Sequence, residues 1–315
     1  MASGKPGLLL FTAIIERMCE PIAERFDVLR LWNESEPEAA IRERGRDVVA
    51  ILTTGQDHRI DAALMDRLPN LRIIAAVGAG YAGVEVAAAR TRGITVANAG
   101  DTHSGDVADH AMALTLAVTQ RILPNDAWVR SGAWVAQGYP QPRRALSAER
   151  FGILGLGHIG HAIAHRLEPF GGEIGWWSPT ARSVPWRRHA SALALADWCT
   201  ILIVAVRGDV LGLVDRKVID AVGRDGCIVN IARGRVIDED ALIAALCEGR
   251  LGGAALDVFR DEPTPPERWA SVPNVVLSPH AAGMTTEALE RLRDTAVRNL
   301  KSVLDGGAVA NEVFS

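Results

Sequence analysis

Three glycines at a fixed spacing, Gly155, Gly157 and Gly160, separate an apolar run from an amphipathic stretch. The run 151–154 is typical of a buried strand, and apolar residues recur at helical spacing over 159–170. In such a strand, turn and helix, the first glycine reverses the chain, the second lets backbone approach a pyrophosphate, and the third lets the helix lie close to the strand. The N–H groups at the helix start then face the phosphates. The pattern favours a dinucleotide site over a plain glycine-rich turn.

The strand after this helix should carry the residues that select the cofactor. An NAD-type fold places Asp or Glu at the end of that strand, where the carboxylate accepts hydrogen bonds from the adenosine ribose. Here the carboxylate is missing, and the strand is followed by Ser178, Thr180 and Arg182, which suit a 2′-phosphate. The sequence therefore favours NADP(H), with NAD(H) possible. The alternative is that Arg182 and the nearby Arg187-Arg188 pair are simply exposed.

Three polar residues beyond the glycine turn have the types that proton transfer and carboxylate binding need: Arg233, Glu262 and His280. An imidazole can donate or accept a proton near neutral pH, a carboxylate can orient it, and a guanidinium offers a planar fork to a substrate carboxylate. Glu262 and His280 each follow an expected strand. Taken singly, each residue also fits a plainer interpretation. His280 could be a buried hydrogen-bonded histidine, Glu262 a loop carboxylate and Arg233 an ordinary turn residue.

Short apolar runs alternate with amphipathic stretches along the chain, which predicts parallel sheets with helices on their faces. In the first part, strands are expected over 8–12, 28–32, 48–53, 73–77 and 95–97, and helices over 15–26, 37–44 and 61–68. In the second part, strands are expected over 173–177, 201–206, 227–231, 254–259 and 275–278, and helices over 214–222 and 238–247. The expected fold class is α/β, with two doubly wound parallel sheets.

A long amphipathic helix over 106–123 should join the two sheets, and another over 285–304 closes the chain. Because such a chain often returns to the domain in which it began, we expect a discontinuous first domain, 1–98 plus 285–315, and a second domain, 99–284. The segment 125–150 mixes aromatic residues, prolines and an arginine pair without core periodicity. This composition suits a subunit interface or a solvated surface loop.

The bulk composition argues against several classes of partner. The 315 residues carry a net charge of -4, and the pI is about 6.1, which gives no general electrostatic reason to bind nucleic acid or an anionic membrane. The apolar run near the N-terminus is too short for a signal sequence or a membrane span. His161 and His165 stand four residues apart without a third ligand, so no metal site is expected. The cysteines form no CxxC motif and are expected to be buried thiols, which favours a reducing, cytoplasmic location.

Three further stretches point to one family. They are NIARGRVIDEDAL at 230–242, LDVFRDEP at 256–263 and SPHAAG at 278–283. In order and spacing they resemble the signature segments of the D-isomer-specific 2-hydroxyacid dehydrogenases, and most of all those of the glyoxylate/hydroxypyruvate reductases. The resemblance extends to VGAGYAGV at 77–84 and DVAD at 106–109, so it covers nearly the whole chain. It implies a flavodoxin-like substrate domain and a Rossmann dinucleotide-binding domain with a cleft between them.

The resemblance also implies the reaction and the main roles. Hydride would pass from the nicotinamide to C2 of a small 2-keto acid such as glyoxylate or hydroxypyruvate, giving the D-2-hydroxy acid. His280 would be the acid or base, Glu262 its partner, and Arg233 the group that binds the substrate carboxylate. The backbone amides of the loop Gly78, Ala79 and Gly80 would hold the same carboxylate.

Further cofactor contacts follow from the resemblance. Asp257 matches the position at the nicotinamide carboxamide, and Ser104 matches a hydroxyl position near the cofactor. The remaining contacts fall on His158 and Ile159 in the glycine-turn helix and on Val206 after a later strand. Members of the family pair through the cofactor domain, so a homodimer is expected.

Two alternatives stay open at this stage. Enzymes of the same lineage act on phosphoglycerate, phosphite or formate. The formate enzymes pair the histidine with Gln, so Glu262 argues against formate as the substrate, while phosphoglycerate and phosphite stay open. Other relatives are non-catalytic, dinucleotide-sensing proteins of transcriptional repression. This chain has no basic or low-complexity tail that would support such a role.

Overall fold

The computed structural model describes residues 4–55, 58–206 and 210–313. The chain forms two compact units, Met1–His103 with Thr285–Ser315, and Ser104–Met284. The first segment ends at His103 rather than at residue 98, because the residues in between stay bonded to the first unit. The N–H of Asn98 donates to the carbonyl of Asn311, and the N–H of Ala99 donates to that of Gly78.

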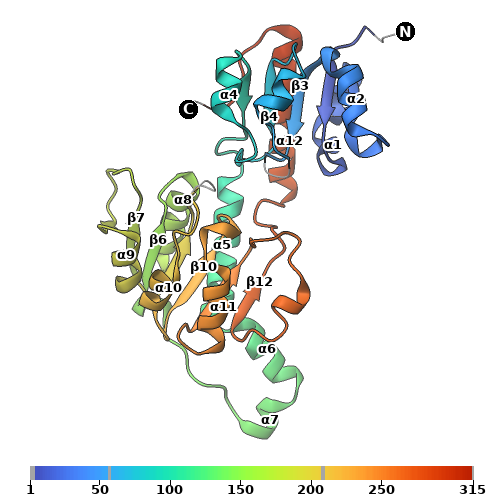
Figure 1. Cartoon of the computed structure of the whole chain (residues 1–315). Helices are drawn as coiled ribbons and strands as arrows, with labels where there is room; N and C mark the ends of the chain where they lie inside the picture. Colours follow the sequence, from blue (N-terminus) through green and yellow to red (C-terminus); the bar gives the residue numbers. More distant parts are fainter. Residues whose placement is uncertain (1–3, 56–57, 207–209, 314–315) are drawn as a thin grey trace. The chain divides into compact units, whose positions relative to one another are not determined.

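The first unit contains a five-stranded parallel sheet in the order β2-β1-β3-β4-β5 (Figure 1). Its strands are β1 (Gly7–Leu10), β2 (Asp27–Arg30), β3 (Val48–Thr53), β4 (Ile73–Ala76) and β5 (Thr95–Ala97). Its helices are α1 (Glu16–Ala23), α2 (Pro37–Arg44), α3 (Ala62–Asp66), α4 (Val86–Thr91) and α12 (Thr286–Asp305), with 3-10 turns η1 (Ala13–Ile15), η2 (Leu31–Asn33) and η3 (Gly45–Asp47). This is the flavodoxin-like strand order.

Side chains of this sheet alternate between two cores, as the two-residue period of a strand requires. Leu8 and Leu10 of β1 belong to a core shared with α1 and α12, whereas Leu9 belongs to a core shared with α2, α3 and α4. The guanidinium of Arg72 also donates to the carbonyl of Val303 in α12 at 2.7 Å. The closing helix is therefore an integral layer of the first unit.

The second unit contains a seven-stranded parallel sheet in the order β12-β11-β10-β9-β6-β7-β8 (Figure 1). Its strands are β6 (Arg150–Leu154), β7 (Glu173–Trp177), β8 (Arg187–Arg188), β9 (Ile201–Val204), β10 (Cys227–Asn230), β11 (Gly253–Leu256) and β12 (Val275–Leu277). Its helices are α5 (Ser104–Thr119), α6 (Ile122–Arg130), α7 (Ala133–Gln137), α8 (His158–Leu167), α9 (Ala192–Trp198), α10 (Arg216–Val222) and α11 (Glu239–Cys247), with 3-10 turns η4 (Leu146–Ala148), η5 (Glu168–Phe170), η6 (Gly234–Val236) and η7 (Pro266–Arg268). This is the Rossmann order, which reverses between β6 and β9.

Two helical layers cover this second sheet. Helices α5 and α8 pack against side chains of β6 and β9 in one hydrophobic core. Helices α9, α10 and α11 pack in a second core against the strand side chains that point to the opposite face of the sheet. The expected fold class, α/β with two doubly wound parallel sheets, flavodoxin-like and Rossmann, is confirmed. Because all strands of a sheet run in parallel, the segments that follow β6, β7, β9, β10, β11 and β12 emerge at one edge of the second unit.

The helix predicted over 106–123 is correct as far as Thr119 and wrong over its last four residues. Helix α5 ends at Thr119, and Arg121 takes a left-handed backbone with φ 53° before α6 begins. The cause is Pro124, which lacks an N–H and whose ring would clash with the carbonyl of Gln120 in a continuous helix. A new helix start places this proline in the first turn of α6, where no intrahelical donor is needed.

The segment after this break forms an arm, residues 122–139, that contributes nothing to the core of the second unit. Helices α6 and α7 contain no buried residue. The exposed apolar side chains of the arm are Ile122, Leu123, Val129, Trp134, Val135 and Tyr139. Within the described ranges of the chain, no helix is both long and apolar enough to cross a membrane.

The cysteines are free thiols in differing surroundings. Burial raises the pKa of Cys199 to about 12 and that of Cys19 to about 11, so both stay protonated and inert near neutral pH. Cys227 is partly buried. The prediction of four buried thiols is wrong for Cys247, because the last residue of α11 faces solvent.

Candidate functional site

The glycine turn lies between β6 and α8, at the carboxyl edge and topological switch of the second sheet. Gly155 has φ +99°, and a Cβ at Gly160 would lie 2.0 Å from the carbonyl O of Gly155, so only glycine lets α8 start this close to the strand. A Cβ at Gly157 would meet no atom within 4 Å. The space beside this backbone is open, and it adjoins the first turn of α8, which contains His158 and Ile159. These features fit a pyrophosphate at the positive end of the helix.

Two further predicted cofactor residues lie close to this turn. The Cα of Val206 lies 2.8 Å from the position of a Cβ on Gly155, so the segment after β9 borders the turn. Ser104 is the first residue of α5 and is 9% exposed. It sits beside α8, because the guanidinium of Arg166 in α8 donates to the carbonyl of Gly105 at 3.2 Å.

The turn after β7 contains the residues predicted to select the cofactor. The hydroxyl of Ser178 is buried and donates to the carbonyl of Thr180 at 2.6 Å, so Ser178 shapes the turn. Thr180 and Arg182 are exposed. Arg188, which from the sequence could be a plain surface residue, also reaches this turn. Its guanidinium donates to the Ser178 carbonyl at 3.2 Å and lies 5.5 Å from the centre of the Trp176 ring.

His280 and Glu262 form a hydrogen-bonded pair at the same edge of the sheet. Nδ1 of His280 lies 2.6 Å from Oε2 of Glu262. The other oxygen, Oε1, accepts from the backbone N–H of Phe259 at 2.9 Å, which fixes the carboxylate. Because Nδ1 faces the carboxylate, Nε2 is the ring nitrogen left for a reacting group.

Arg233, in the segment after β10, belongs to the same cluster. Burial lowers the pKa of its guanidinium, and the negative charge of Glu262 opposes that effect. Burial also raises the pKa of the Glu262 carboxyl, but hydrogen bonds from His280 and Phe259 and the charges of His280 and Arg233 outweigh it, so this pKa lies below its ordinary value. The structure thus brings the three predicted residues together as an ionised carboxylate beside an imidazole and a guanidinium.

A backbone contact sets the spacing within this cluster. A Cβ at Gly234 would lie 1.8 Å from the carbonyl carbon of Phe259. The loop that carries Arg233 therefore rests directly on the loop that carries Glu262, and glycine is required at this point of close approach.

In the first unit, the predicted carboxylate-binding loop Gly78 to Gly80 follows β4. The carbonyls of this loop are engaged: that of Gly78 accepts from the N–H of Ala99, and that of Ala79 accepts from the Asn98 amide at 2.8 Å. Within residues 4–55, 58–206 and 210–313, no backbone carbonyl accepts from the N–H groups of Gly78, Ala79 or Gly80. Three consecutive N–H groups of this kind suit a small anion.

Comparison with known proteins decides the family. Residues 112–282 match the model described as D-isomer specific 2-hydroxyacid dehydrogenase, NAD binding domain. The chain is 40% identical over 304 residues to a 2-ketogluconate reductase of Gluconobacter oxydans, with 95% of each chain covered. The chain belongs to the D-isomer-specific 2-hydroxyacid dehydrogenase family.

Two other members of this 2-hydroxyacid dehydrogenase family are also similar. A glyoxylate/hydroxypyruvate reductase A of Arabidopsis thaliana is 37% identical over 310 residues, with 98% of each chain covered. The NADPH-dependent glyoxylate/hydroxypyruvate reductase of Sinorhizobium meliloti, solved with NADP and malonate, has a TM-score of 0.88 at 36% identity and covers 98% of this chain and 97% of its own. The cofactor of this dehydrogenase is a nicotinamide dinucleotide, NAD(H) or NADP(H). When bound, this cofactor supplies or accepts the hydride.

Two polar residues of this 2-hydroxyacid dehydrogenase site, His110 and Ser278, are not evident from the sequence. His110 of α5 lies 2.9 Å from the hydroxyl of Ser278, which lies 2.6 Å from Asp257. The only sequence feature that points to His110 is weak: it is a histidine in a helix whose buried side is otherwise mostly apolar. Nothing in the spacing links it to a serine 168 residues further along the chain.

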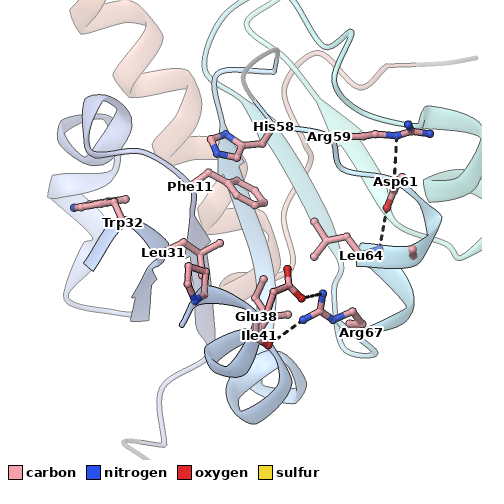
Figure 2. A pocket seen from close by; sticks show the side chains of 12 residues that line it. Phe11, Leu31, Trp32, Glu38, Ile41, His58, Arg59, Asp61, Leu64 and Arg67 are labelled. Atoms are coloured by element: carbon pink, nitrogen blue, oxygen red, sulfur yellow. Dashed lines mark hydrogen bonds and ion pairs between the residues drawn. The ribbon is translucent and has the colours of Figure 1, made fainter. Parts of the chain in front are cut away.

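The first unit of the present protein contains a surface pocket of about 470 Å³ beside α2 and α3 (Figure 2). The rings of Phe11 and His58 stack there with centroids 4.6 Å apart, and Arg67 pairs with Glu38 at 2.7 Å. None of the predicted site residues lines this pocket.

Proposed function

We propose that this protein is an NADPH-preferring reductase that converts small 2-keto acids, such as glyoxylate and hydroxypyruvate, to D-2-hydroxy acids. The observation that carries the proposal is the His280 and Glu262 pair, 2.6 Å apart, with Arg233 beside it, on the sheet edge that also carries the glycine turn. An acid, its orienting carboxylate and a carboxylate-binding cation are the groups that reduction of a keto acid needs.

In this proposal His280 moves the proton. As hydride arrives at C2, the carbonyl π electrons go to oxygen, and that oxygen takes the proton from Nε2 of the imidazolium. Glu262 holds the orientation of the ring through Nδ1. Oxidation of the hydroxy acid runs the same proton transfer in reverse. Arg233 binds the substrate carboxylate, and its guanidinium also draws charge toward the carbonyl oxygen. In the first unit, the Gly78 to Gly80 amides are the proposed anion-binding group.

Replacing Glu262 by Gln should lower kcat about tenfold, because the neutral amide replaces a charge-assisted hydrogen bond with a weaker one and holds the His280 ring less firmly. The depressed pKa of Glu262 has a second consequence. The pairing stabilises the fold above its unfolded pKa and is lost as pH falls through the lower folded-state value, so Glu262→Gln should also flatten acid unfolding. Glu267→Gln, at an exposed carboxylate nearby, serves as the control. An unchanged kcat in Glu262→Gln would show that this pair does not orient the proton donor.

The preference for NADPH is proposed from the turn after β7 and from the NADPH-dependent relative of known structure. A carboxylate that would repel a 2′-phosphate is missing, and Arg188 places a positive charge at the turn. Replacing Arg188 by Gln should therefore lower kcat/KM for NADPH about tenfold or more, the effect of losing one charge-assisted hydrogen bond, while the value for NADH changes little. Arg187→Gln is the matched control. Equal losses with both cofactors would mean that Arg188 only holds the turn.

We further propose that the protein is a homodimer through the second unit, with the arm 122–139 in the interface. The arm buries no side chain in its own unit, and Val135 is 94% exposed. Exposed apolar surface of this kind marks a contact site. Val135→Asp should weaken the dimer at least tenfold in sedimentation equilibrium, whereas Leu211→Asp, at an exposed apolar residue outside the arm, should not. A monomeric wild type would refute the assembly.

The experiment that tests the proposed function is a panel of initial rates. The purified protein is given NADPH or NADH with glyoxylate, hydroxypyruvate, pyruvate and 2-ketogluconate. We expect turnover with NADPH and the shorter acids; the 40% identity to a 2-ketogluconate reductase makes a longer acid the second candidate. Binding of NADPH without oxidation in the presence of any of these acids would contradict the proposal and favour a sensing role.

A further inference from the structure

A polar network lies directly behind the loop that carries His280. It joins three residues of the second unit: His110 in α5, Asp257 after β11 and Ser278 after β12. Nε2 of His110 lies 2.9 Å from the Ser278 hydroxyl and 3.4 Å from Oδ1 of Asp257. The Ser278 hydroxyl donates to the same Oδ1 at 2.6 Å.

The number of protons available decides which atoms of this network donate and which accept. A hydroxyl has one proton, and that of Ser278 is used on Asp257, so Ser278 must accept from His110. His110 therefore carries a proton on Nε2. The carboxylate of Asp257 is 1% exposed, and a buried carboxylate is stable only when its oxygens are fully engaged.

Asp257 in turn holds the catalytic loop by its backbone. Its Oδ1 accepts from the N–H of Ala281 at 2.8 Å, and its Oδ2 accepts from the N–H of Ala282 at 3.0 Å. The carbonyl of Asp257 accepts from the N–H of His280 at 2.8 Å. His280 itself has φ 53°, a left-handed conformation that a non-glycine residue keeps only when its surroundings impose it.

We propose that His110 is a positioning residue for the reaction: through Ser278 it fixes the Asp257 carboxylate, which holds the backbone of residues 280–282 and so aims the His280 ring. Without His110, the Ser278 hydroxyl loses the donor that fixes its orientation, so of the two hydrogen bonds to Oδ1 of Asp257 only that from the N–H of Ala281 stays fixed. A small misplacement of the acid is enough to slow proton transfer. The catalytic part of this inference rests on the proposed reductase function.

The test combines activity with hydrogen exchange. His110→Leu should lower kcat about tenfold with little change in KM for the keto acid, and His110→Gln, whose amide can donate from nearly the same place, should recover most of the loss. Ser278→Ala should behave like His110→Leu, and the double variant should be no worse than either single one, because both act through one bond. His165→Leu, at an exposed histidine of the same unit, is the control.

Amide exchange of the peptide that contains residues 280–282 gives a readout independent of turnover. It should speed up in His110→Leu and Ser278→Ala but not in His110→Gln or His165→Leu. Unchanged exchange in His110→Leu would overturn the inference whatever the assay shows, as would faster exchange with an unchanged kcat. If the wild type reduces no keto acid while His110→Leu still exchanges faster, the reductase proposal fails and the structural role of His110 stands.

Discussion

Replacing His280 by Ala should lower kcat for keto-acid reduction by about 10² to 10⁴, the contribution that a positioned general acid usually makes. The ring is the proton donor of the proposed reaction, and its Nδ1 is already committed to Glu262 at 2.6 Å. KM for the acid should change much less, because Arg233, the proposed ligand of the substrate carboxylate, is intact in this variant. Single-turnover rates with bound NADPH would measure the loss on the chemical step.

Structural damage can be separated from loss of the acid. The His280 side chain is 38% exposed, so its removal should leave the unfolding midpoint and NADPH affinity close to those of the wild type. His161→Ala, at a histidine on the exposed side of α8, is a control for loss of an imidazole. If His280→Ala kept a rate within threefold of the wild type, a water or another residue would have to supply the proton.

Replacing Arg233 by Ala should lower kcat/KM by about 10² to 10³, which corresponds to losing two charge-assisted hydrogen bonds to the substrate. The guanidinium is half-buried, so it meets the acid where water competes little, and its charge also helps to keep Glu262 ionised. The loss should appear mainly in KM, with a smaller part in kcat from poorer orientation. Arg233→Lys should recover only part of it, because an ammonium offers no planar fork.

Arg235→Ala is the matched control, since this exposed arginine lies two residues away on the same loop. Substrate truncation provides a second check: an analogue whose carboxylate is replaced by a carboxamide should be a poor substrate for the wild type and should lose little more in Arg233→Ala. An unchanged kcat/KM for the keto acid in Arg233→Ala would show that the carboxylate is bound elsewhere.

Local sequence patterns predicted the features that depend on short spacings. The apolar run before Gly155 and the helical period after it define β6 and α8, and the same logic places most strands of both sheets. Arg233, Glu262 and His280 each follow a parallel strand, so topology alone brings them to one edge. The close approach of Gly234 to Phe259, which sets two of these loops against each other, depends on the fold and is not visible in the sequence.

Features that depend on distant partners were not visible in the sequence. The role of Arg188 requires that β8 pairs with β7, yet β8 is only two residues long and has no periodicity of its own. The role of His110 depends on a partner 168 residues away. The exposed apolar residues of the arm resemble core residues in composition, and only the fold shows that they lie outside the core of their own unit.

The stereochemical course of one reaction tests the central claim most directly. The purified protein is incubated with hydroxypyruvate and NADPH that carries deuterium at both positions of C4, and the product is analysed for configuration and for deuterium at C2. Hydride transfer by this site predicts D-glycerate that carries deuterium at C2, one molecule for each NADPH oxidised. Formation of L-glycerate, product without deuterium at C2, or no oxidation of NADPH by a protein that binds it would contradict the account.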